Sequence, residues 1–232
     1  MSWHLHQFRD SGTLISALCE HVAGVLARAV SDYGRASLVV SGGTTPIPLF
    51  RALADTDLPW AEIVISLADE RWVDETHPDS NAALVRRELL HGYASTARFV
   101  SMKCAAKDAF DAESKVSRLL ASSIFPIDML LLGMGEDGHT ASLFPKARGL
   151  AAALNPDSAL VCHGIQVPGM PYTRMTLGLG VILRARKRVI HIQGENKYKR
   201  LQQAMQAGPA EEMPVRAVLH APALDTEIFY SP

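Results

Sequence analysis

Short apolar runs alternate along the chain with longer amphipathic stretches. Four runs are rich in Val, Ile and Leu and end at glycine or at charged residues: Ser37–Val40, Ile63–Leu67, Ile127–Leu132 and Val189–Ile192. Such runs are typical of parallel strands buried on both faces. Apolar spacings of three and four predict helices over Leu14–Tyr33, Asn81–His91, Asp108–Ser122 and Asn196–Gln206. The alternation predicts an α/β fold, with a mostly parallel sheet and helices on both faces.

Length and composition favour one globular domain. The chain has 232 residues, of which 48% are hydrophobic and 20% charged, which suits a protein with a full core rather than a disordered one. It contains no internal repeat or low-complexity tract, and Ala207–Pro214 reads as a loop rather than a domain boundary. We therefore expect a single domain over residues 1–232.

Charge and cysteine usage narrow the partners and the compartment. A net charge of −1 gives no general attraction to nucleic acid or to anionic membranes, and the basic cluster at 184–188 reads as a surface patch. The three cysteines lack paired spacing, which favours buried free thiols in a reducing compartment. No signal-like segment and no apolar run of the roughly 20 residues that span a bilayer is evident. We expect a cytoplasmic protein without nucleic-acid or membrane partners.

Polar residues follow the predicted strands in four segments: Ser41–Thr45, Asp69–Arg71, Gly133–His139 and Gly194–Lys197. Ligands of open parallel sheets bind outside the carboxyl ends of the strands, so these loops can converge on one pocket.

The first loop resembles a cradle for a phosphate group. Glycine backbone and hydroxyl side chains would supply donors from Ser41, Gly42, Gly43, Thr44 and Thr45, and the helix that follows favours an anion at its N-terminus. The Lys of a nucleotide-binding loop is missing, which argues against a bound nucleoside triphosphate. An ordinary strand-to-helix turn remains the alternative.

The second and third loops carry candidate catalytic groups. Asp69 and Arg71 follow a buried strand, where Arg suits bidentate binding of an anion, although a solvated ion pair is the alternative. In the glycine-rich third loop, Asp137 precedes His139 by two residues and could orient its imidazole for proton transfer. A structural histidine is the alternative there.

Two cationic residues are further candidates for the site, and several motifs of other enzyme classes are absent from the sequence. Arg174 and Lys197 are candidate anion ligands, although on spacing alone solvated surface cations are the more common alternative. There is no G-x-S-x-G elbow, no His-x-x-x-His pair and no dinucleotide fingerprint. The sequence therefore predicts neither a nucleophilic serine, nor a metal, nor a cofactor.

These motifs, in this order, resemble the 6-phosphogluconolactonases, which share a family with glucosamine-6-phosphate isomerases. The matching stretches are SGGTTP (41–46), ADERWV (68–73), SNAALVRRELL (80–90), LLGMGEDGHTASLFP (131–145), PYTRMTL (171–177) and QGENK (193–197). The match runs from about residue 10 to about residue 220, and the tail after Pro214 departs from the family pattern.

The resemblance implies a Rossmann-like fold and metal-independent hydrolysis of 6-phospho-D-glucono-1,5-lactone to 6-phosphogluconate in the oxidative pentose phosphate pathway. It implies that His139 is the general base. We expect Asp137 or Asp69 to orient it, Arg71 or loop N–H groups to stabilise the oxyanion, and the first loop with Arg174 and Lys197 to hold the phosphate. We expect a monomer or a weak homodimer.

Two other functions compete with this one. A glucosamine-6-phosphate deaminase would share the Gly-x-x-x-Asp-Gly-His loop, but the Asn and Glu expected after the histidine are replaced here by Thr140–Pro145. A non-catalytic sugar-phosphate sensor would need a DNA-binding domain, and a first strand at about residue 37 leaves little room for one.

Overall fold

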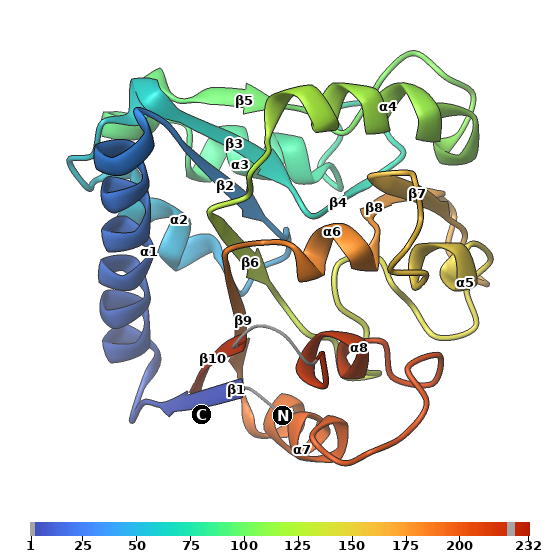
Figure 1. Ribbon diagram of the computed structural model, residues 1–232. Helices are drawn as coiled ribbons and strands as arrows, with labels where there is room; N and C mark the ends of the chain where they lie inside the picture. Colours follow the sequence, from blue (N-terminus) through green and yellow to red (C-terminus); the bar gives the residue numbers. More distant parts are fainter. Residues whose placement is uncertain (1–2, 222–225) are drawn as a thin grey trace.

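The computed structural model describes residues 3–221 and 226–232, and within them a parallel sheet forms the centre of the molecule (Figure 1). This sheet has seven strands in the order β1-β10-β9-β6-β2-β3-β5, and every neighbouring pair is parallel. Their bounds are β1 Trp3–Gln7, β2 Ala36–Val40, β3 Ile63–Leu67, β5 Arg98–Val100, β6 Met129–Leu132, β9 Lys187–Gln193 and β10 Thr226–Ser231. The four predicted strands are neighbours in it, in the order β9-β6-β2-β3, and their continuous apolar runs are buried almost throughout.

Helices cover both faces of this sheet, which confirms the α/β class. They are α1 Ser11–Tyr33, α2 Ile47–Ala54, α3 Asn81–Glu88, α4 Ala109–Ser123, α5 Leu150–Ala153, α6 Leu179–Leu183, α7 Glu195–Ala204 and α8 Val215–Leu219. Short 3-10 turns occupy Trp60–Glu62 and Gly92–Thr96. In Figure 1, α1 and α2 lie on one side of the sheet, and α4, α6 and α8 lie on the other. The four predicted helices begin and end within three residues of their predicted limits.

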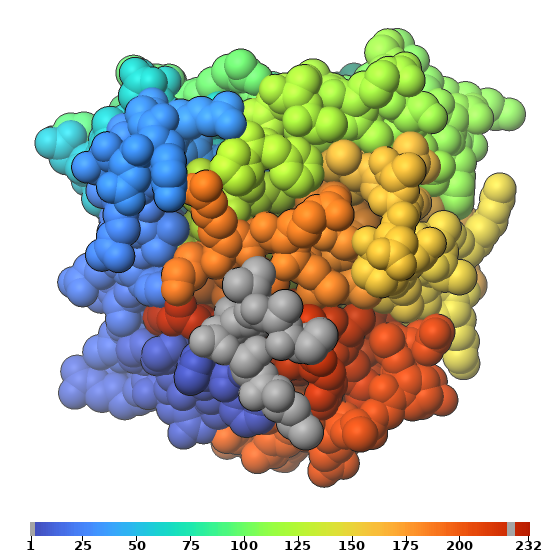
Figure 2. Space-filling model, viewed as in Figure 1, coloured from blue at the N-terminus to red at the C-terminus, as the bar shows by residue number. Residues whose placement is uncertain are grey.

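The first helix shows how local sequence sets these limits. The Asp10 carboxylate accepts a hydrogen bond from the Thr13 N–H at 2.8 Å and caps α1, and Gly34 ends it in the left-handed conformation. Among the described helices, α1 alone has the length and mean hydropathy, 1.4, of a membrane span. Its buried side chains, however, recur every three or four residues and pack on the sheet and α2. Its other face forms one flank of the surface (Figure 2), as in a core helix of a soluble protein.

A second sheet departs from the parallel pattern. Strands β4 (Asp69–Arg71), β8 (Arg174–Leu177) and β7 (Cys162–Ile165) form an antiparallel sheet in the order β4-β8-β7. Only Ala68 separates β4 from β3, so the chain leaves the central sheet and enters the second one directly. The segment expected to be a loop at Asp69–Arg71 is therefore a strand, which brings it beside Arg174.

Two further expectations from the sequence are wrong. The first strand does not begin at about residue 37 but is β1, at Trp3–Gln7. The sequence pattern misses it because its partly exposed residues at the sheet edge lack the apolar run that marks a buried strand. Arg188, placed by the sequence in a surface patch, is 2% exposed and donates to the Leu183 carbonyl and to Thr226. The tail after Pro214, where the sequence departs from the family pattern, includes residues 222–225, which lie outside the described residues. The strand that follows them, β10, lies between β1 and β9.

Candidate active site

A cavity of about 200 Å³ opens at the carboxyl ends of β2, β6 and β9, as expected for a parallel sheet. Its lining includes nine residues predicted from the sequence: Ser41, Gly42, Gly43, Thr45, Asp69, Arg71, His139, Arg174 and Lys197. Thr44 is exposed outside the lining, and Asp137 lies behind His139. Segments up to 156 residues apart along the chain, from Ser41 to Lys197, thus meet at one site.

The glycine loop after β2 is shaped by close packing. Gly43 has a φ of 97°, a left-handed conformation that favours glycine. A Cβ at Gly42 would lie 1.9 Å from Oδ1 of Asn81, so only glycine lets the two segments approach so closely. The loop therefore presents its backbone to the cavity just before α2 begins, which supports the anion cradle predicted from the sequence.

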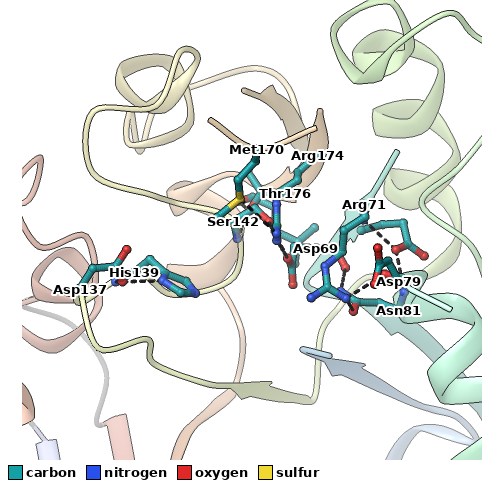
Figure 3. Close-up of polar contacts among 12 residues, drawn as sticks. Asp69, Arg71, Asp79, Asn81, Asp137, His139, Ser142, Met170, Arg174 and Thr176 are labelled. Atoms are coloured by element: carbon teal, nitrogen blue, oxygen red, sulfur yellow. Dashed lines mark hydrogen bonds and ion pairs between the residues drawn. The ribbon is translucent and has the colours of Figure 1, made fainter. Parts of the chain in front are cut away.

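The imidazole of His139 is held from two sides. Its Nδ1 lies 2.5 Å from Oδ1 of Asp137, and its ring stacks on that of Phe144 with centroids 3.9 Å apart (Figure 3). Burial alone would raise the pKa of Asp137, but its hydrogen bond to His139 and the charge of that ring lower the pKa below its ordinary value. The loop is closed by the Gly135 N–H, which donates to the His139 carbonyl at 2.9 Å.

Asp69 belongs to a different group of side chains. Its Oδ2 accepts a hydrogen bond from Ser142 Oγ at 2.5 Å and lies 3.9 Å from Nη1 of Arg174. Burial lowers the pKa of the Arg174 guanidinium, and the charge of Asp69 opposes this. The guanidinium lies 5.0 Å from the centroid of Phe144, the ring on which His139 stacks. Of the two carboxylates proposed to orient the imidazole, Asp137 is the one that contacts it (Figure 3).

The guanidinium of Arg71 has one nitrogen with two hydrogen bonds and another nitrogen without a partner in the described structure. Its Nη1 donates to the Asp79 carbonyl at 2.9 Å and to Oδ1 of Asn81 at 2.6 Å. Its Nε is buried and has no hydrogen-bond partner among the described residues. The guanidinium therefore retains a donor close to the cavity that it lines.

The buried carboxylate of Glu70 explains why β4 stays beside α3. It accepts hydrogen bonds from Ser80 Oγ and from the backbone N–H groups of Arg71, Asn81 and Ala82. Burial raises the pKa of Glu70, while these hydrogen bonds act in the opposite direction. This carboxylate caps α3 and so positions Arg71 and Asn81 at the cavity wall.

Sequence reasoning missed three residues of the site. The sequence pattern marks Asn81 only as the start of a helix and Ser142 only as part of a motif, although each contacts a predicted site residue. His191 lines the cavity but was interpreted as a strand residue, because it stands among apolar neighbours in VIHI. In the part of the chain that the structure describes, no group of three His, Cys, Asp or Glu side chains is arranged to hold a metal ion.

The fold and the cavity together define a class of α/β enzyme. Its site combines a glycine-rich loop, three cationic side chains and a His–Asp pair at the carboxyl edge of a parallel sheet. The chain belongs to the family described as glucosamine-6-phosphate isomerases/6-phosphogluconolactonase, whose profile matches residues 9–227. The resemblance noted from the motifs is thereby confirmed.

Individual relatives extend this match over nearly the whole chain. A 6-phosphogluconolactonase of Pseudomonas aeruginosa is 44% identical over 205 residues, covering 88% of this chain and 86% of the relative. One of Pseudomonas putida is 40% identical, with coverages of 98% and 93%. The crystal structure of a 6-phosphogluconolactonase from Shewanella baltica superposes with a TM-score of 0.96 at 36% identity, covering 99% and 98% of the two chains. These three relatives share the name 6-phosphogluconolactonase, and this chain matches them in sequence and, for the crystal structure, also in fold.

Proposed function

We propose that this chain hydrolyses 6-phospho-D-glucono-1,5-lactone to 6-phosphogluconate, the lactonase step of the oxidative pentose phosphate pathway. The observation that carries the proposal is the His139–Asp137 pair at a cavity that also holds Arg71, Arg174 and Lys197. The names of the relatives support the same substrate. A phosphorylated lactone needs both parts of such a site: cations for its phosphate and a base to activate water.

In this proposal His139 is the general base. When Asp137 accepts the Nδ1–H, the lone pair of the imidazole is on Nε2, which is free to take a proton from water. The water oxygen attacks C1 of the lactone and forms a tetrahedral oxyanion. When this intermediate collapses, the bond between C1 and the ring oxygen breaks, and the protonated His139 returns the proton to that oxygen. No covalent intermediate with the enzyme and no metal ion is required, because a δ-lactone is already a reactive ester.

The charged groups of the cavity divide into two roles. Arg71, whose Nε lacks a partner in the described structure, or the N–H groups of the loop at Gly133–Gly138 stabilise the oxyanion. The phosphate is held by Arg174, Lys197 and the cradle, whose members are Ser41, Gly42, Gly43, Thr44 and Thr45. Because the Thr44 side chain is exposed, this residue contributes its backbone N–H.

The decisive experiment couples lactone hydrolysis to 6-phosphogluconate dehydrogenase and subtracts the spontaneous rate. Loss of a general base lowers rates by about 10²–10⁴-fold, so His139→Ala should lower kcat by that order and still bind 6-phosphogluconate. The control is His91→Ala, at an exposed histidine outside the cavity lining. Full turnover by His139→Ala would exclude His139 as the base, and ammonia release from glucosamine 6-phosphate would instead identify a deaminase.

A second variant separates binding from chemistry. Arg174→Ala should mainly raise KM, because phosphate contacts are made in the ground state and persist in the transition state. An unchanged KM would remove Arg174 from the phosphate site. We further propose that the protein works in the cytoplasm as a single domain and as a monomer or weak homodimer, without nucleic-acid or membrane partners. Light scattering over a range of concentrations would test its oligomeric state.

A further inference from the structure

One buried polar side chain of the cavity has no role in the mechanism above. His191 lies on β9, is 4% exposed and lines the cavity. Neither of its ring nitrogens has a hydrogen-bond partner among the described residues, and the buried Oγ of Ser41 in the same cavity is likewise without one. Buried polar groups in native proteins are almost always paired. Two unpaired groups that line one cavity therefore indicate a position where a bound molecule completes the hydrogen bonds.

The strand order places His191 beside an open position at the end of β6. β6 lies between β9 and β2, and Leu132 of β6 pairs with Ile190 of β9. His191 is therefore level with Gly133, the residue that follows β6. A Cβ built at Gly133 would meet nothing within 4 Å, so the space beside the imidazole is open. At this level the chain that follows β6 therefore places no side chain between the imidazole and the cavity.

The charge state of the imidazole defines what it can bind. Burial lowers the pKa of His191 to about 4, and the positive charge of Lys197 acts in the same direction. At neutral pH the ring is uncharged, so it carries one N–H donor and one nitrogen acceptor. The ring and the ammonium of Lys197 belong to residues that line the same cavity. A phosphate held by that ammonium would come within reach of a neutral N–H donor.

We propose that His191 is a substrate-binding residue that donates a hydrogen bond to the phosphate group beside Lys197. The proposal rests on the proposed function, since it concerns how the same substrate is recognised. Ser41 Oγ supplies a second neutral donor from the other side of β6. Neutral donors satisfy phosphate oxygens that the cations leave free, and the ligand in turn satisfies two buried groups of the protein.

Kinetics with two lactones test this assignment. For the phosphorylated lactone, His191→Leu should raise KM about 10-fold or more, the range expected for one hydrogen bond to a charged group, with a much smaller change in kcat. For glucono-1,5-lactone, which has no phosphate, kcat/KM should be the same in wild type and variant. Equal losses on both lactones would place His191 against the sugar ring and overturn the proposal, as would an unchanged KM.

Matched variants separate binding from a structural role. His163 is also buried, with its Nε2 unpaired in the described structure, but it lies on β7 and does not line the cavity. His163→Leu should leave KM unchanged. His191→Gln keeps a donor and should recover part of the affinity that His191→Leu loses. Thermal unfolding of the variants is measured in parallel. If the raised KM of His191→Leu is explained by a loss of folded protein, and His191→Gln recovers no affinity for the substrate, the binding role is refuted.

A direct measurement does not depend on turnover. In protein labelled with ¹⁵N-histidine, addition of inorganic phosphate should shift the ring nitrogens of His191 and leave those of His163 unchanged. Absence of a shift at saturating phosphate overturns the proposal even if the enzyme hydrolyses the lactone. If instead the shift appears but wild type does not accelerate lactone hydrolysis, the proposed function fails while the phosphate contact of His191 stands.

Discussion

Gly135→Ala tests whether the position of the His139 imidazole determines the rate. An ideal Cβ at Gly135 would lie 2.1 Å from Cε1 and 2.2 Å from Nδ1 of His139, and 2.8 Å from Oδ1 of Asp137. The backbone at Gly135 does not have a positive φ, so alanine fits the local conformation without strain. The substitution therefore acts on the His139–Asp137 pair rather than on the path of the chain.

The expected size follows from these distances. Because Cβ contacts below 3.0 Å are essentially never found, the imidazole of His139 must move by about 1 Å at least. Its stacking on Phe144 limits how it can move, and the displacement breaks the 2.5 Å contact with Asp137. A misplacement of about 1 Å can cost roughly 10²-fold in rate. We expect kcat to fall by about 10²-fold, with a much smaller change in KM.

The assay is lactone hydrolysis corrected for the spontaneous rate, with thermal unfolding measured in parallel. Gly24→Ala is the matched control, because a Cβ there meets nothing within 4 Å on α1 and should add about 1 kcal/mol of helix stability without changing kcat. If Gly135→Ala keeps kcat within a few-fold of wild type while remaining folded, the position of His139 does not limit the rate. The role assigned to the His139–Asp137 contact would then be wrong.

Three further predictions concern stability. Glu70→Ala should lower the free energy of unfolding in urea by about 3 kcal/mol or more, since one hydroxyl and three backbone N–H groups lose their acceptor; a loss below about 1 kcal/mol would contradict this. Because burial lowers the pKa of His191 to about 4 from 6.5, its ring binds fewer protons when folded, so it contributes stability that is complete above pH 6.5 and is lost as pH falls towards 4. Between pH 7 and pH 5, wild type should therefore lose about 2 kcal/mol more than His191→Gln, and parallel pH profiles would refute the reasoning. Asp108 caps α4 by accepting hydrogen bonds from the Phe110 and Asp111 N–H groups. Asp108→Ala should therefore lower the stability measured by thermal unfolding by about 1 kcal/mol, and Asp108→Asn should lower it less. Equal melting points of wild type and Asp108→Ala would show that the cap is not needed.

The parts of the fold that the sequence predicted correctly depend on local pattern. β2, β3, β6 and β9 are visible as continuous apolar runs because strands in the middle of a parallel sheet are buried on both faces. The edge strand β1 lacks that pattern, because one side of an edge strand faces solvent. The strand order, and with it the place of the antiparallel sheet, has no local signal.

The same division holds for the site. The His139–Asp137 pair was predictable because the two residues are neighbours in one tight loop, and its geometry depends on a few backbone angles around Gly138. The contact of Asp69 with Ser142 joins residues 73 positions apart, and no spacing rule reaches that far.

The sequence by itself thus determined four strands of the central sheet, four helices and the polar segments that follow those strands, because each depends on burial period, caps and turns within a few residues. Only the tertiary structure decided that Asp137 rather than Asp69 contacts His139, and that a histidine in an apolar strand lines the cavity. The physical reason is that strand order and side-chain contacts across it arise from packing summed over the whole chain. A residue such as His191 therefore acquires its role from neighbours that are distant in sequence.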